Sequence, residues 1–163
     1  VSQMNLFEDK DRLSSMIISN GAAEYLEAAK KLMVDPVSAP HPFWFCAFQS
    51  IELSLKAFLR GKGFSKEQLK SRDLGHKLDV LYKESVANAL ADHVTLTVAE
   101  ESVVCEVGAM YCQKVFQYTE TGWSTLPFAH VALDLAEKLY LGIRPFAEAQ
   151  RTAHHDSPTA VRN

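Results

Sequence analysis

Apolar residues recur at helical spacing along most of the chain. The pattern is clearest in residues 43–61, where one face is formed by Trp44, Ala47, Phe48, Ile51, Leu55, Phe58 and Leu59. This spacing predicts a helix with a wide apolar face. Pro42 suits a first helical turn, so we expect the helix to start near His41 or Pro42, and Gly61 provides a C-terminal stop.

The residues before this segment predict an earlier helix. Asp9 or Asp11 can cap it, and its apolar positions include Leu13, Ile17, Leu26 and Met33. It should stop before Asp35-Pro36, because the stretch DPVSAPHP contains three prolines, which cannot donate backbone hydrogen bonds inside a helix. We interpret that stretch as a linker.

The middle of the chain predicts a short turn and a third helix. Ser65 can cap the turn SKEQL, and Asp73 can cap a helix that follows it. The apolar positions of that helix are Leu74, Leu78, Leu81, Tyr82 and Val86. Residues 92–99 alternate like a strand, but no partner strand is evident, so we predict an extended connection.

Two more helices are predicted towards the C-terminus. The fourth begins near Glu100 and should hold Tyr111, Lys114 and Val115 on or near its inner face. The fifth opens at Pro127 and should be kinked or ended by Pro145. The sequence therefore predicts an all-α fold, an antiparallel four- to five-helix bundle forming one domain over residues 1–151, with a flexible tail at 152–163.

Composition narrows the range of functions. A formal charge of −3 and a pI near 6.1 provide no broad cationic field, so any contact with nucleic acid must be local. The acidic N-terminus does not resemble a signal peptide, and no run approaches the roughly 20 apolar residues that span a bilayer. Three cysteines without close pairing indicate neither a disulfide framework nor a zinc ribbon. We therefore expect a soluble cytoplasmic protein.

No pattern indicates a metal or another cofactor. His154-His155-Asp156 could suggest metal ligands, but adjacent side chains diverge on a helix or a strand. A bundle that stores metal would need Glu-x-x-His pairs projecting inward, and that spacing is missing. The prediction is that neither a metal ion nor a cofactor is bound, and that the cysteines are small packed side chains.

Residues 48–85 resemble HEPN domains (higher eukaryotes and prokaryotes nucleotide-binding). Family members carry A-x-E-x-x-L-K-A-x-L, a glycine, a loop and then G-H-x-L-x-x-L. The matching positions here are Glu52, Leu55, Lys56, Ala57, Leu59, Gly75, His76, Leu78 and Leu81. The resemblance implies a helical bundle, usually a homodimer, whose polar cleft binds nucleotide or RNA. Many members are metal-independent ribonucleases with an R-x(4–6)-H signature near the end of the later helices.

The chain departs from that nuclease signature. Arg72 and His76 are separated by three residues and lie where the third helix begins, not near the end of a later helix, and the fourth helix has no histidine. His76 could transfer a proton while Arg72 holds a phosphate. Alternatively, His76 could bond the backbone and pack against Glu52 or Tyr82, while Arg72 is solvated. Glu52 and Lys56 could form a buried pair with His76 or Arg72, or an exposed pair within their helix.

Two functions follow from these candidates. The first is a noncatalytic module that binds nucleotide, RNA or a partner protein as a homodimer, with Glu52, Lys56, Arg72 and His76 as ligand-binding residues. The alternative is a divergent metal-independent ribonuclease that uses Arg72 and His76, the toxin of a toxin–antitoxin or phage-defence system with an antitoxin as partner.

Overall fold

The computed structural model describes residues 14–33, 40–114 and 129–155, and within these ranges it contains helices and no strand. The elements are α1 (Ser15–Leu32), α2 (Pro40–Gly61), α3 (Lys66–Lys70), α4 (Leu78–Ala87), the 3-10 turn η1 (Leu90–Asp92), α5 (Val98–Cys112) and α6 (Ala129–His155). The predicted all-α bundle is confirmed. Its five longer helices correspond to the predicted ones, and α3 corresponds to the short turn.

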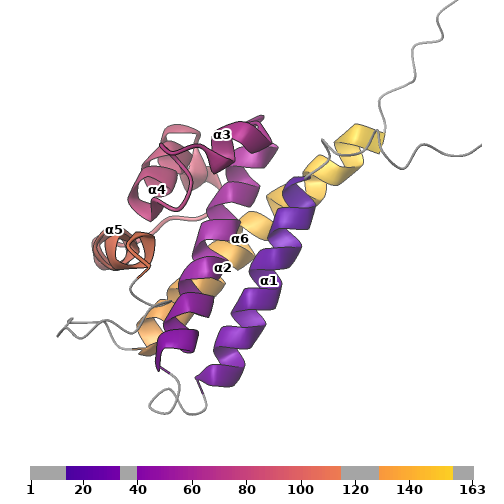
Figure 1. Cartoon of the computed structure of the whole chain (residues 1–163). Helices are drawn as coiled ribbons and strands as arrows, with labels where there is room; N and C mark the ends of the chain where they lie inside the picture. The colour runs from indigo at the N-terminus through magenta and orange to yellow at the C-terminus, as the bar shows by residue number, and fades with distance from the viewer. Residues whose placement is uncertain (1–13, 34–39, 115–128, 156–163) are drawn as a thin grey trace, which may run out of the picture.

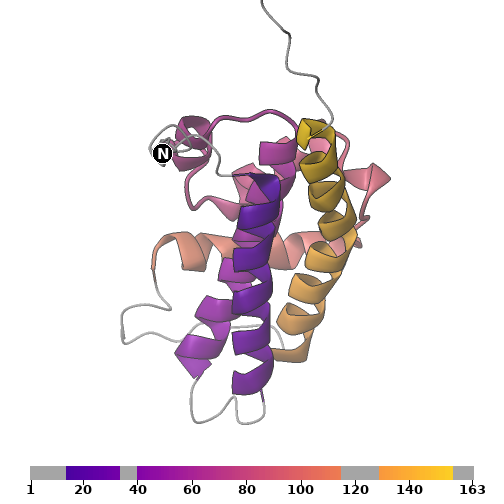
Figure 2. The ribbon, with the colours of Figure 1, turned by 90° about the vertical axis from the view of Figure 1, so that its right-hand side faces the viewer.

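Helix α2 lies at the centre of the bundle. Helices α1, α2 and α6 lie side by side along the long axis, while α4 and α5 pack on the side of α2 away from α1 (Figure 1). An ion pair of 2.7 Å between Lys30 and Glu137 joins α1 to α6, and Arg144 Nη1 donates to Asn20 at 2.7 Å, so the two helices are antiparallel. Helix α5 runs across the bundle axis (Figure 2).

The core follows directly from the apolar face of α2. Its fully buried side chains include Phe43, Phe48, Ile51, Leu55, Phe58 and Leu59. Burial of side chains of this size contributes roughly 1.5–3 kcal/mol each relative to exposure. On the side that faces α1, small hydroxyl residues allow close approach: Ser15 Oγ donates to the Ala57 carbonyl at 2.6 Å, and Ser50 Oγ donates to the Ala22 carbonyl at 2.9 Å. These buried hydroxyls are satisfied by backbone carbonyls.

Local capping signals account for several helix ends. Helix α2 begins at Pro40, slightly earlier than expected, and ends at Gly61 as predicted. Ser65 caps α3 as predicted, in a reciprocal capping box with Gln68. Of the connection predicted over residues 92–99, residues 94–97 lie outside regular structure, whereas Asp92 belongs to η1 and Val98 and Ala99 belong to α5. Thr97 with Glu100 makes a second capping box, which starts α5 at Val98. These ends depend on residues within one helical turn.

Two predicted caps are wrong. Helix α1 begins at Ser15, where the Ser14 side chain accepts a hydrogen bond from Ile17 N at 3.2 Å, so neither Asp9 nor Asp11 is its cap. Asp73 does not start a helix, because α4 begins only at Leu78 and residues 71–77 form a loop, hereafter loop 71–77. The loop uses its own backbone groups, and Gly75 N donates to the Ser71 carbonyl at 2.8 Å. These bonds close turns instead of a helix.

Three expectations near the C-terminus also need correction. Lys114 does not lie on an inner face: it follows the end of α5, has a φ of 61° and is exposed. Val115 and Pro127 lie outside the described residues. Of the two predicted effects of Pro145, the end of the helix is wrong, because α6 continues to His155 and thus into the predicted tail, and the kink stays a prediction. Proline has no N–H, so Pro145 cannot donate to the carbonyl of Leu141, four residues earlier in the helix. Both residues are exposed, so water can hydrate that carbonyl.

Among the described residues, no helix combines the length and apolar character needed to cross a membrane.

Two apolar side chains expected on inner faces, Ile17 and Val86, are instead about half exposed, at 53% and 48%. They lie on different helices, α1 and α4, so each is a single exposed side chain on its own helix.

Candidate functional site

The candidate site is built around Glu52, in the middle of α2. Its side chain is 1% exposed, although its neighbours on the helix belong to the apolar core. It follows Ile51 in a helix that packs against α1 and α6 as well as against α4 and α5, so little of the α2 surface remains in water. Burying a carboxylate is costly unless hydrogen-bond donors replace the lost water. The partners of Glu52 therefore decide what the site can do.

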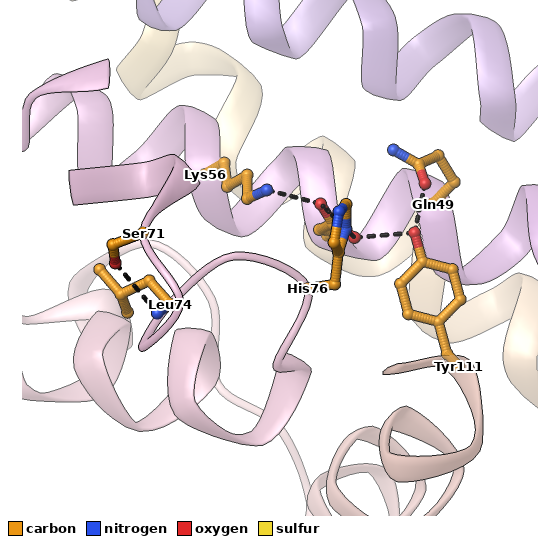
Figure 3. A network of polar contacts seen from close by, with 7 residues as sticks. Gln49, Lys56, Ser71, Leu74, His76 and Tyr111 are labelled. Atoms are coloured by element: carbon orange, nitrogen blue, oxygen red, sulfur yellow. Dashed lines mark hydrogen bonds and ion pairs between the residues drawn. The ribbon is translucent and has the colours of Figure 1, made fainter. Parts of the chain in front are cut away.

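Three side chains from three parts of the chain reach the Glu52 carboxylate (Figure 3). Lys56 Nζ, one turn further along α2, lies 2.6 Å from Oε1. His76 Nδ1, from loop 71–77, lies 3.1 Å from Oε1 and 3.0 Å from Oε2. The Tyr111 hydroxyl, from α5, donates to Oε2 at 2.7 Å. We call Glu52, Lys56, His76 and Tyr111 the Glu52 network.

Loop 71–77 brings His76 to the network. Ser71 Oγ accepts from Leu74 N at 3.3 Å, and Gly75 N donates to the Ser71 carbonyl at 2.8 Å (Figure 3 draws the first of these). A Cβ atom at Gly75 would lie 2.8 Å from that carbonyl oxygen, so glycine permits the close turn. The loop therefore directs the next residue, His76, towards α2.

The Glu52 carboxylate determines the tautomer of the His76 ring. A carboxylate accepts hydrogen bonds, so Nδ1 must carry a proton, and Nε2 is left as the second ring nitrogen. The His76 side chain is 64% exposed. One edge of the ring is thus held by a buried acid while most of the ring faces solvent.

Tyr111 is a member of the network that the sequence analysis did not identify. It was expected on the inner face of its helix for its apolar ring, and it is indeed buried. The available signal is a tyrosine on an inner helix face, because a buried tyrosine hydroxyl usually needs a polar partner in the core. Burial, followed by the charge of Glu52 and the hydrogen bond to it, raises the pKa of the Tyr111 phenol, which therefore stays protonated and donates.

The Tyr111 hydroxyl also contacts the side-chain amide of Gln49, one turn before Glu52 on α2. A phenol has one proton, so it can donate fully to one acceptor at a time. The bond to the charged carboxylate is the stronger kind. Gln49 thus lies at the edge of the network and completes the polar surroundings of the hydroxyl.

The four predicted site residues separate into two groups. Glu52, Lys56 and His76 meet, and the buried arrangement considered for Glu52 and Lys56 is the one observed, because Lys56 is 12% exposed and Glu52 1%. The exposed intrahelical alternative is wrong. Arg72 lies outside the network: it is exposed and forms no hydrogen bond or ion pair with any residue that the structure describes.

The cysteines show no sign of nucleophilic activation. Cys46, Cys105 and Cys112 are free thiols and partly buried, so they are less buried than expected. Burial raises the pKa of the Cys46 and Cys105 thiols, which lowers the fraction of reactive thiolate at neutral pH. Cys46 packs against the hydrophobic core.

No metal centre is found in the described part of the chain, where no three histidine, cysteine, aspartate or glutamate side chains are grouped to hold an ion. His154 and His155 lie in the last turn of α6, and Asp156 lies outside the described residues. The Glu52 network itself contains one carboxylate and one imidazole, and its remaining two members are a lysine and a protonated tyrosine, which are poor metal ligands.

Comparison with protein-family models, with curated proteins and with solved structures finds no significant match to this chain. The HEPN resemblance of residues 48–85 therefore stays a prediction, and the fold and the Glu52 network stand on their own geometry.

Proposed function

We propose that this protein is a noncatalytic binding module in which the Glu52 network fixes loop 71–77 against α2. The observation that carries the proposal is that the two side chains joined by the Glu52–His76 hydrogen bond differ strongly in solvent exposure. Glu52 is 1% exposed and His76 is 64% exposed, so a buried acid holds a surface ring in place. A loop held in this way keeps its shape before a partner arrives, which lowers the entropic cost of binding.

The network supports a positioning role more than a chemical one. A His–Glu pair can orient a general base, but acid–base catalysis also needs the other reacting groups to be held within hydrogen-bond reach of that base. His76 lies mostly in solvent, and the exposed Arg72 has no partner among the described residues that would fix its position. The third donor, Tyr111, binds the same carboxylate from α5 and adds a purely structural connection.

The predicted homodimer belongs to this proposal as its assembled form. The HEPN resemblance motivates it, and sedimentation equilibrium of the purified chain at several concentrations tests it. A mass of two chains that persists on dilution is the expected result, and a single-chain mass at every concentration would refute the dimer.

A cleavage assay tests the noncatalytic proposal. The purified chain is incubated with end-labelled RNA in a buffer containing a chelator, and the RNA length is followed on a denaturing gel. We expect the RNA to stay intact. Cleavage that disappears in H76A but persists in H130A, a matched exposed histidine on α6, would overturn the proposal and favour the ribonuclease alternative with His76 as its acid or base.

A binding module also requires that loop 71–77 keeps its position in the free protein. Hydrogen exchange of the loop amides measures this directly. We expect the bonded amides of Leu74, Gly75 and Lys77 to be protected in the wild type and to lose protection in E52Q. Equal exchange in the two proteins would show that the network does not hold the loop.

A further inference from the structure

Charge is distributed unevenly along this weakly acidic chain. Residues 60–77 hold six of its 17 lysines and arginines but two of its 20 aspartates and glutamates. That segment therefore has a formal charge of +4, and the rest of the chain has −7. The net charge of −3 therefore conceals a local excess of positive charge. A protein without a broad cationic field needs such a local excess to contact nucleic acid.

The cationic residues lie on the segment that runs from the end of α2 through α3 and loop 71–77 to the start of α4, which we call the basic end. Its members are Arg60, Lys62, Lys66, Lys70, Arg72 and Lys77. The segment folds back on itself, because α3 packs beside the C-terminal end of α2 (Figure 1) and Phe64 N donates to the Leu59 carbonyl at 3.1 Å. Lys66 and Lys70 are four residues apart on α3 and so share a helix face.

Part of the charge of the basic end is exposed to solvent, although Arg60 donates to the Phe64 carbonyl at 2.8 Å and Lys62 Nζ lies 5.2 Å from the centre of the Phe58 ring. Lys62, Lys70 and Arg72 are exposed, and none of them forms an ion pair with a residue that the structure describes. Several lysines elsewhere are paired, as in Lys30 with Glu137 and Lys138 with Glu100, whereas Lys31 and Lys114 are exposed and form no ion pair with a described residue. Lys70 and Arg72 are only two residues apart, so their like charges repel each other, and a polyanion relieves that repulsion.

The surface around these charges favours one class of partner. A protein interface usually contains a buried aromatic or aliphatic anchor, and a membrane surface is usually contacted through apolar side chains that insert into it. The exposed large apolar residues of the described chain are Ile17, Val86, Val98 and Leu141, and none lies within the basic end. Phe64, the aromatic residue of that segment, is partly buried. Recognition there must rest on charge.

From these observations we infer that the basic end binds the phosphate backbone of RNA without reading its bases. The inference rests on the proposed binding function and names the ligand class. Loop 71–77 contributes Arg72 to this surface, and the Glu52–His76 bond holds the loop in position. Regularly spaced phosphates match lysines that act as point charges, and the guanidinium of Arg72 can grip one phosphate with two donors.

The test compares two double variants with equal loss of charge. K70Q/R72Q removes two exposed cations of the basic end, whereas K31Q/K114Q removes two exposed cations elsewhere. Fluorescence anisotropy measures binding to labelled oligo-uridine and oligo-adenosine of about 20 nucleotides, which exceeds common site sizes of single domains. Far-UV circular dichroism checks that each variant is folded.

We expect both RNAs to bind the wild type with similar affinity and with a marked dependence on salt between about 50 and 200 mM. K70Q/R72Q should bind more weakly, and the slope of log affinity against log salt should fall by roughly 1.4, because each lost contact with single-stranded phosphate removes about 0.7. K31Q/K114Q should bind like the wild type.

Three results would overturn the inference: no RNA binding by the wild type, equal loss of binding in the two double variants, or equally tight binding of polyglutamate, which would assign the surface to an acidic protein segment. A strong preference for one of the two RNAs would overturn the base-independent part. The noncatalytic function is tested separately in the same samples, because RNA that is recovered shortened would show cleavage and refute that function. Intact RNA without binding refutes only the inference.

Discussion

Replacing Glu52 with glutamine tests the energetic role of the network. The variant keeps the shape of the side chain but removes its charge and turns one acceptor oxygen into a donor. The site is 1% exposed, so water cannot compensate, and the Lys56 ammonium, 12% exposed, loses its counter-ion at 2.6 Å. Breaking a buried ion pair on one side costs about 3–5 kcal/mol. Because Lys56 keeps some contact with water, we expect a loss near the lower end, about 3 kcal/mol.

Urea unfolding at pH 7, followed by far-UV circular dichroism, measures this loss as a lower midpoint at an unchanged m-value. The matched variant E52Q/K56M removes the stranded ammonium as well, and we expect it to be more stable than E52Q by about 1 kcal/mol or more. H76A should cost about 1 kcal/mol or less, since a mostly exposed partner gains little from the pair.

The ranking of these variants can refute the reasoning. A loss below about 1 kcal/mol in E52Q would mean that the buried carboxylate does not hold the three elements together. A double variant no more stable than E52Q would mean that the Lys56 charge is not the group left uncompensated. Y111F separates the remaining donor: it should cost about 1.5–3 kcal/mol, the usual contribution of a hydrogen bond to a charged group.

Two further predictions concern the packing and charge of α5. G108A should destabilise the protein by about 1–3 kcal/mol in urea unfolding, because the new Cβ would lie 2.8 Å from the Leu78 Cβ and force α4 and α5 apart; an unchanged midpoint would contradict this packing. For Glu100, burial raises the pKa, but the bonds and charge of Lys138 and the bonds from Thr97 outweigh it and leave the pKa below 4.5. A carboxyl whose pKa is lower in the folded state stabilises that state at pH values above its pKa in the unfolded chain. The stabilisation is lost as the pH falls through the pKa of the folded state. E100Q should therefore be less stable than the wild type at pH 7, and the difference should shrink below about pH 4.5 in thermal melts; a constant difference would contradict the assignment.

The sequence by itself determined the helices and several of their ends. The apolar period of residues 43–61 required a buried helix, Gly61 ended it, and Ser65 capped α3, as the structure confirms. These features could be predicted because they act within a few residues, through side-chain spacing and hydrogen bonds to the nearest free backbone groups. The local excess of positive charge in residues 60–77 was equally readable, although the exposure of each cation was not.

The tertiary structure decided the candidate site. Asp73 is a plausible cap by its type, but the turns of loop 71–77 override it and carry His76 to Glu52. Tyr111 lies 59 residues from Glu52 in sequence, and no local pattern marks its hydroxyl as a ligand of that carboxylate. Which buried polar groups meet depends on which helix faces pack together, and the need to satisfy a desolvated carboxylate then selects the partners. For that physical reason the bundle was predictable from local periodicity, whereas the Glu52 network emerged only once the helices were assembled.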